Sequence, residues 1–253
     1  MYLHRSTLGP VDLAFTDRYG GVSGVPYAEL NLAQDDADDA SARSENLRRV
    51  VTDFAPDLVA RPDAGVALPV AQMRQVHGTV VDLVEDRRSP GLPEADAMVT
   101  ARPGVVLLVR AADCVPVVLA DPEHQVIAVA HAGRRGMVDG IAAATVSRMR
   151  DSGASSIRAW IGPSICGACY EVPAAMQAEV GALVPAAVST TSWGTPALDI
   201  GAGVRAQLEA AGVTVVDVAT CTRESADLYS YRRDGAAAGR HAGLIRLHPK
   251  GTR

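Results

Sequence analysis

The sequence predicts a mixed α/β (α+β) fold in a single domain spanning residues 1–253, with β-sheet layers flanked by helices. Short apolar runs typical of buried strands alternate with helical patterns along the chain. Hydrophobic residues make up 48% and charged residues 21% of the 253 residues, as in globular proteins. No internal repeat or long linker divides the sequence.

The N-terminal half is expected to hold a strand at 11–16 and a helix at 41–54, with Ser41 as its cap. The four aspartates at 35, 36, 38 and 39 fit a solvated helix entry, which the helix dipole favours. Strands follow at 80–84, 105–109, 115–119 and 126–130. Their near-continuous apolar residues suit strands buried on both faces. Pro116 indicates a bulge or an edge position.

The C-terminal half is expected to alternate helices and short strands. Apolar residues recur at spacings of three and four from 137 to 150, which predicts a helix that Gly153 ends. A strand at 157–161, helices at 173–183 and 200–211, and strands at 213–218 and 244–247 complete the prediction.

Charge and segment patterns exclude several classes of protein. The 24 basic and 29 acidic residues give a net charge of −5, which argues against a nucleic-acid partner. The uncharged stretch 180–198 contains two prolines and is a poor membrane span, and no signal peptide is present. We therefore expect a cytoplasmic protein without a membrane partner. Its oligomeric state, monomer or small homo-oligomer, is left open.

Three residues that can ligate a metal stand at strand ends, beside glycines or polar turns: His77, Cys114 and His131. If the strands pair, these side chains converge at one edge. Two imidazoles and a thiolate suit zinc, and three protein ligands leave the open position of a catalytic zinc site. The alternative is that the histidines are hydrogen-bonded structural residues and Cys114 is a small core residue.

Two basic, glycine-containing segments are candidate anion sites. Arg134 and Arg135 lie between a buried strand and a helix start, which predicts either a phosphate cradle or a tight turn with solvated arginines. The segment 231–240 carries Arg232, Arg233 and Arg240, and either holds an anionic or sugar-bearing substrate or is a surface loop.

The remaining cysteines carry weaker signals. Cys166 and Cys169 have the CxxC spacing of half a zinc site or a redox pair, but no second CxxC exists. A tight turn of small residues is the favoured interpretation. Cys221 follows a predicted strand, and we expect it in the core.

Ordered motifs cover the chain from about residue 19 to 247. They are Gly20-Gly21-Val22-Ser23, Leu30-Asn31-Leu32, Gln75-Val76-His77-Gly78, Ala112-Asp113-Cys114-Val115-Pro116, His131-Ala132-Gly133-Arg134-Arg135-Gly136, Ile161-Gly162-Pro163-Ser164-Ile165, Cys169-Tyr170-Glu171-Val172, Cys221-Thr222, Ser230-Tyr231-Arg232-Arg233 and Gly239-Arg240. Together they resemble the YfiH-like family, long called multicopper polyphenol oxidase or laccase-like. Its members are associated with purine nucleoside phosphorylase activity.

The resemblance implies specific site residues. The family's zinc ligands match His77, Cys114 and His131, and copper is a less favoured metal. The residues implied or proposed to hold substrate or phosphate are Arg134, Arg135, Arg48, Ser23 and Asn31. Asp113 orients a ligand, shuttles a proton or caps a turn. The family usually has Trp where Arg134 stands.

The resemblance also implies the reaction. A transferase of this type joins phosphate to the sugar of adenosine, inosine, guanosine or methylthioadenosine and releases the base, and a hydrolase activity deaminates adenosine. Purine nucleoside and phosphate would be the partners. One alternative is a cysteine-type amidase or peptidoglycan-precursor editing hydrolase, with Cys114 as nucleophile and His131 as base. Others are a copper polyphenol oxidase, for which six histidines without a His-x-His pair are few, and a non-enzymatic binding module.

Overall fold

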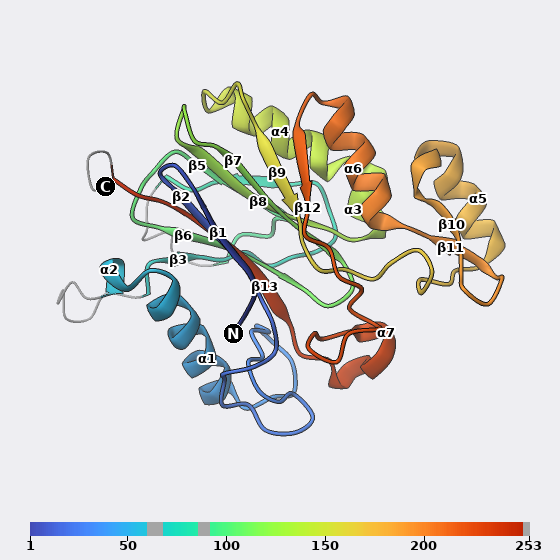
Figure 1. Cartoon of the computed structure of the whole chain (residues 1–253), viewed down its shortest axis with the longest axis horizontal. Coiled ribbons are helices and arrows are strands. Elements are labelled where there is room, and N and C mark those ends of the chain that lie inside the picture. The colour runs from blue at the N-terminus through green and yellow to red at the C-terminus, as the bar shows by residue number, and fades with distance from the viewer. Residues whose placement is uncertain (60–67, 86–91, 250–253) are drawn as a thin grey trace.

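Two β-sheets stacked face to face form the centre of the computed structural model, which describes residues 1–59, 68–85 and 92–249 (Figure 1). The five-stranded sheet has the order β1 (Tyr2–Leu8), β2 (Val11–Thr16), β13 (His241–Leu247), β6 (Val106–Ala111) and β3 (Val70–Ala71). The six-stranded sheet has the order β12 (Thr214–Asp217), β9 (Arg158–Ile161), β7 (Val115–Asp121), β8 (Val126–Ala132), β5 (Ala97–Thr100) and β4 (Val81–Leu83).

Helices cover the outer faces of both sheets (Figure 1). Helix α1 (Ala40–Phe54), followed by α2 (Pro56–Val59), packs on the five-stranded sheet. Helices α3 (Arg134–Asp139), α4 (Ile141–Asp151) and α6 (Ile200–Ala210) pack on the six-stranded sheet. Helix α5 (Ala174–Leu183) lies beside the hairpin of β10 (Val188–Thr190) and β11 (Pro196–Leu198), with the 3-10 turn η1 (Pro185–Ala187) between them in the chain. The short α7 (Tyr231–Asp234) and η2 (Gly235–Ala237) precede β13.

Three apolar cores hold these four layers together. The central core lies between the sheets and includes Phe15 of β2, Val118 of β7 and Ile245 of β13. The other two cores join each sheet to its own helices. Every residue of β6, β7 and β8 is buried, which is why their sequences are almost continuously apolar. The predicted mixed α/β architecture with flanked sheet layers is confirmed.

Several local predictions were wrong. Pro116 lies neither at a sheet edge nor in a bulge, because it is the second residue of β7, which pairs with β8 and β9 on its two sides. The expected helix at 137–150 is two helices, because Gly140 adopts a left-handed φ of 91° between them. Asp39, not Ser41, caps α1 by accepting the N–H of Ala42 at 2.9 Å.

The sheet topology positions the candidate site. Strand β6 ends at Ala111 and β7 begins at Val115, so the turn between them crosses from one sheet to the other. Strand β8 ends beside that turn, with His131 paired to Pro116 of β7. Among the described residues, no helix has the length and apolarity needed to cross a membrane.

Candidate metal centre and its cavity

The two histidines and the cysteine predicted to converge lie together in the structure. His77 is in the loop between β3 and β4, Cys114 in the turn between β6 and β7, and His131 near the end of β8. One ligand atom from each lies within 4.8 Å of the other two. The Sγ atom of Cys114 is 3.7 Å from Nε2 of His77, and the two imidazole rings meet edge to face. This spacing fits a single metal ion.

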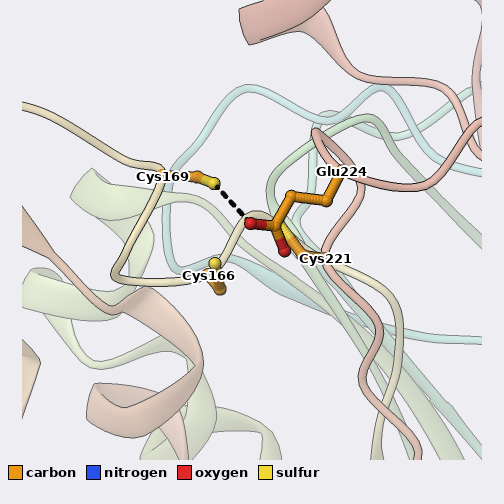
Figure 2. Close-up of side chains that lie close together, drawn as sticks. All are labelled: Cys166, Cys169, Cys221 and Glu224. Atoms are coloured by element: carbon orange, nitrogen blue, oxygen red, sulfur yellow. Dashed lines mark hydrogen bonds between the residues drawn. The ribbon is translucent and has the colours of Figure 1, made fainter. Parts of the chain in front are cut away.

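A second group of metal-ligating side chains joins two loops (Figure 2). Cys166 and Cys169 form a tight turn between β9 and α5, where the N–H of Cys169 donates to the carbonyl of Cys166 at 3.0 Å. Cys221 lies beside this turn together with Glu224. Cys221 is half-buried, so its predicted place in the core was wrong: a backbone bridge to Ser164 brings it to the other loop instead.

A buried carboxylate that the sequence analysis did not single out organises the first group. Asp96 is fully buried and accepts a hydrogen bond from Nδ1 of His131 at 2.8 Å. It also accepts the backbone N–H groups of Val76, His77 and Gly78 at 3.2, 2.9 and 2.7 Å. Burial alone would raise the pKa of Asp96, but these hydrogen bonds outweigh it and lower the pKa. Asp96 therefore stays ionised and leaves Nε2 of His131 free to face a metal.

The backbone around the cluster is tightly constrained. His77 has a φ of 61°, a left-handed conformation that a non-glycine residue adopts only when its surroundings hold it there. The three N–H bonds to Asp96 supply that restraint. A Cβ atom at Gly133 would lie 2.5 Å from Cδ2 of His77 and 3.2 Å from Sγ of Cys114. Glycine at 133 therefore leaves the space in which the ligand atoms meet.

The charges of Cys114 and His131 support each other. Burial opposes charge at both groups, but their mutual attraction is stronger. The pKa of Cys114 is lowered to about 6, and the pKa of His131 is raised to about 9 with further help from Asp96. Cys114 is therefore a thiolate at neutral pH, which is the state that binds metals and attacks electrophiles.

The cluster opens into a cavity of about 660 Å³. Five arginines line it: Arg74, Arg110, Arg134, Arg232 and Arg240. Three acids, Asp35, Asp36 and Asp113, and two tyrosines, Tyr170 and Tyr231, also face it. The cavity thus offers cations for an anionic group, carboxylates for hydroxyl groups and rings for a flat base.

The three arginines predicted to hold phosphate lie in different places. Arg134 lines the cavity. Arg135 is not among the lining residues: its side chain is 76% exposed, and its nearest ion-pair contact is with Asp139 at 3.9 Å. Arg48 lies on α1, where it donates to Glu45 at 2.7 and 2.8 Å, and it does not line the cavity either.

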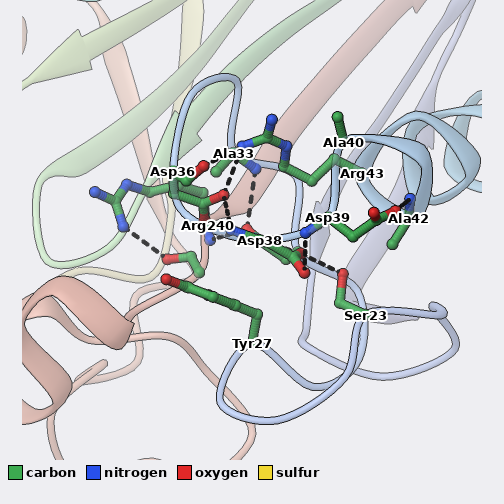
Figure 3. Close-up of polar contacts among 12 residues, drawn as sticks. Ser23, Tyr27, Ala33, Asp36, Asp38, Asp39, Ala40, Ala42, Arg43 and Arg240 are labelled. Carbon is green, nitrogen blue, oxygen red and sulfur yellow. Dashed lines mark hydrogen bonds and ion pairs between the residues drawn. The ribbon is translucent and has the colours of Figure 1, made fainter.

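Ser23 and Asn31, predicted to hold substrate, shape the cavity wall from behind (Figure 3). Nδ2 of Asn31 donates to Asp36 at 2.7 Å and to Asp38 at 3.0 Å, and Ser23 donates to Asp38 at 2.6 Å. Oδ1 of Asn31 accepts the backbone N–H of Arg240 at 2.9 Å. Neither side chain lines the cavity, but both position residues that do.

Asp113 faces the cavity and ties together two loops. Its carboxylate accepts the hydroxyl of Thr222 and the backbone N–H of Arg232, at 2.6 and 2.5 Å. Its φ of 89° is left-handed, so these bonds also hold a strained turn. The structure thus gives Asp113 a structural role, and its role with a proton or a ligand stays a prediction.

Two further cavity arginines have fixed settings. Arg232, from the predicted basic segment, stacks over the ring of Tyr170 with 4.8 Å between Cζ and the ring centroid. Arg110 was not singled out from the sequence, although an arginine inside the apolar run of β6 was a usable signal. It is nearly buried, and its Nε and Nη2 donate to Leu32 and Gln72. Its Nη1 has no hydrogen-bond partner among the described residues.

Residues 12–248 match the family model described as multi-copper polyphenol oxidoreductase laccase. A purine nucleoside phosphorylase of Streptomyces coelicolor is 48% identical over 250 residues, which cover 96% of this chain and 98% of that one. A purine nucleoside phosphorylase of Corynebacterium glutamicum is 40% identical over 245 residues, or 94% and 95% of the two chains.

Solved structures share the fold. A Neisseria meningitidis protein of the DUF152 family superimposes with a TM-score of 0.83 at 32% identity, covering 98% of this chain and 99% of its own. The YfiH protein of Bacillus licheniformis superimposes with a TM-score of 0.82 at 29% identity, covering 94% and 93%.

Proposed function

This chain belongs to the multi-copper polyphenol oxidoreductase laccase family, the YfiH-like group that its motifs resemble, and on that basis we propose that it is a zinc-dependent purine nucleoside phosphorylase. The substrates are phosphate and adenosine, inosine, guanosine or methylthioadenosine. The products are the free base and the sugar 1-phosphate, and adenosine deamination is a second activity of the same site. Relatives 40–48% identical to the chain carry the name of this enzyme.

A three-ligand group open to an arginine-lined cavity carries this proposal. Structural zinc sites are closed by four protein ligands, whereas catalytic ones keep a position for the reactant. His77, Cys114 and His131 supply three ligands beside the cavity. A volume of about 660 Å³ lies within the usual range for small-molecule sites, about 300–1,000 Å³.

The donor set fits zinc. Asp96 fixes one tautomer of His131, and Cys114 is already ionised, so both ligands are prepared for a divalent cation. A bound zinc ion would supply Lewis acidity. Two imidazoles and a thiolate also suit a copper ion. We favour zinc because a multicopper oxidase needs a histidine-rich cluster, and this group, as described, contains two histidines.

The chain's own residues bind and orient the two substrates. The arginines of the wall, with Arg134 nearest in sequence to the metal ligands, hold hydrogen phosphate through charge-assisted hydrogen bonds. Asp35 and Asp36 accept the ribose hydroxyls, and Tyr170 or Tyr231 packs on the base. A phosphate oxygen then bonds to C1′ as the C1′–N9 bond breaks. The electron pair leaves with the purine, and the proton released by hydrogen phosphate balances the one that the purine gains.

Incubation of the purified protein with inosine and phosphate tests this proposal, with hypoxanthine and ribose 1-phosphate measured by chromatography. We expect both products in equal amounts, no reaction without phosphate and loss of turnover in Cys114→Ser. Metal removal should abolish activity and zinc should restore it. Product from metal-free protein at the full rate, or restoration by copper alone, would refute the proposal.

The Cys114–His131 pair supports a second candidate, a cysteine-type amidase. A thiolate with a lowered pKa beside an imidazolium is the arrangement of a nucleophile and its acid–base partner. This reaction needs no metal. Alkylation of Cys114 in chelator-treated protein, followed by amide hydrolysis assays, separates the two functions, because only the amidase would be active before alkylation and inactive after it.

A further inference from the structure

Two short ligand pairs with the same spacing face each other at the second group. Cys166 and Cys169 are separated by two residues, and so are Cys221 and Glu224. The pairs are far apart in the sequence, on the loops β9–α5 and β12–α7. One C-x-x-C turn opposed by a second pair of this spacing is a common way to build a structural zinc site.

The geometry of the four side chains is that of a nearly closed coordination shell. Their ligand atoms all lie within 4.8 Å of one another. Tetrahedral zinc with Zn–S bonds of about 2.3 Å holds its sulfurs about 3.8 Å apart. Figure 2 shows the carboxylate of Glu224 directed at Cys169, and the two are 3.5 Å apart. Small side-chain rotations are enough to close this group around an ion.

We propose that Cys166, Cys169, Cys221 and Glu224 form a second, structural metal site that takes a divalent cation of the zinc class. Four protein ligands leave no open position, in contrast to the three-ligand group on the cavity. The side chain of Arg223 also hydrogen-bonds Cys169 and adds positive charge beside the thiolates. The site lies outside the cavity, whose lining includes none of its four residues.

A metal here would fasten together the two loops that build one wall of the cavity. Tyr170, directly after Cys169, lines the cavity and lies under Arg232. Thr222, directly after Cys221, donates its hydroxyl to Asp113 at 2.6 Å. Without a metal, the described contacts between these loops include two backbone hydrogen bonds around Ser164, with Thr220 and Thr222.

Core packing and disulfide formation explain the group less well. Apolar packing accounts for buried thiols but not for an exposed carboxylate among them. Three cysteines cannot all pair within one chain, so a disulfide would leave the third without a covalent partner. A divalent ion satisfies all four side chains at once.

Cobalt titration of the full-length Cys114→Ser protein, kept reduced, tests the proposal separately from phosphorolysis. That substitution removes the only thiolate of the first group, so thiolate-to-cobalt charge-transfer absorption can come only from the second. We expect this absorption to saturate at one equivalent, to disappear when zinc is added, and zinc to raise the melting temperature. No charge-transfer absorption, or a disulfide among the three cysteines in protein isolated without reductant, would overturn the proposal.

Further variants in the Cys114→Ser background locate the site. Adding Cys169→Ser should weaken cobalt binding by about tenfold or more. Adding Glu224→Gln should weaken it less and retain the absorption, because three thiolates remain. Glu179→Gln, an exposed acid on α5, is the matched control and should change nothing. Equal cobalt affinity in the Glu224→Gln and Cys169→Ser proteins and their parent would also overturn the proposal.

Discussion

The carboxylate of Asp96 lies 2.8 Å from Nδ1 of His131, and the same carboxylate accepts three consecutive backbone N–H groups of the loop that carries His77. One buried side chain therefore sets both the orientation of one imidazole and the backbone position of the other. Such partners of metal-ligating histidines tune the ligand and hold the site in shape.

Asp96→Asn should lower zinc affinity and phosphorolysis by about 10- to 100-fold while the fold is retained. The amide presents only one accepting oxygen, so it cannot satisfy His131 and all three N–H groups together. Competition with a chromophoric chelator measures the affinity, and circular dichroism checks the fold. Asp151→Asn, an exposed acid of α4, is the control. Unchanged affinity in Asp96→Asn would show that the ligand atoms do not depend on this contact.

Gly133→Ala should reduce metal binding more than it reduces stability. The added methyl group would lie 2.5 Å from a carbon of the His77 ring and 3.2 Å from Sγ of Cys114, and so would push the ligands apart. Zinc content after desalting and the melting temperature of metal-free protein separate the two effects. Gly24→Ala is the matched control, because no atom lies within 4 Å of a Cβ built there. If Gly133→Ala retains its zinc, the ligands do not occupy the space beside Gly133.

Much of the fold follows from local sequence patterns. Strands β6, β7 and β8 were predicted because burial on both faces leaves a continuous apolar run. Strand β1 was not predicted, because it alternates between half-buried and exposed residues at a sheet edge and carries His4 and Arg5. The break at Gly140 was also missed, since apolar spacing continues across it.

The candidate site divides in the same way. His77, Cys114 and His131 stand out because soft ligands beside glycines at strand ends form a local pattern. Asp96 has no such pattern, since its partners come from the loop before β4 and from the end of β8. The approach of Cys221 to Cys166 depends on the parallel pairing of β12 with β9, which sequence spacing does not reveal.

Acidification should destabilise the protein through His241. This histidine is fully buried, and its Nδ1 has no hydrogen-bond partner among the described residues, so burial lowers its pKa to about 4. Between pH 6.5 and 4 the unfolded chain binds a proton that the native state does not, and stability falls as pH falls. The loss approaches about 3 kcal/mol at pH 4.

Urea unfolding of wild-type protein and His241→Gln across this range measures the effect. We expect the difference in unfolding free energy between the two proteins to shift in favour of the variant as the pH decreases, because glutamine does not titrate. Above pH 7 the difference should be constant. Parallel pH profiles for the two proteins would show that His241 is not the responsible group.

Adjacent arginines offer a direct test of where phosphate binds. Arg134 lines the cavity, whereas the side chain of Arg135 is 76% exposed and is not part of the wall. A charge-assisted hydrogen bond to a bound anion contributes about 1.5–3 kcal/mol, so Arg134→Ala should raise the KM for phosphate by about 10- to 100-fold. The same change at Arg135 should leave this KM unchanged, because a solvated guanidinium that does not touch the ligand contributes little. Initial rates at saturating inosine and varied phosphate give both constants. A larger effect at Arg135 than at Arg134 would place the phosphate outside this cavity wall.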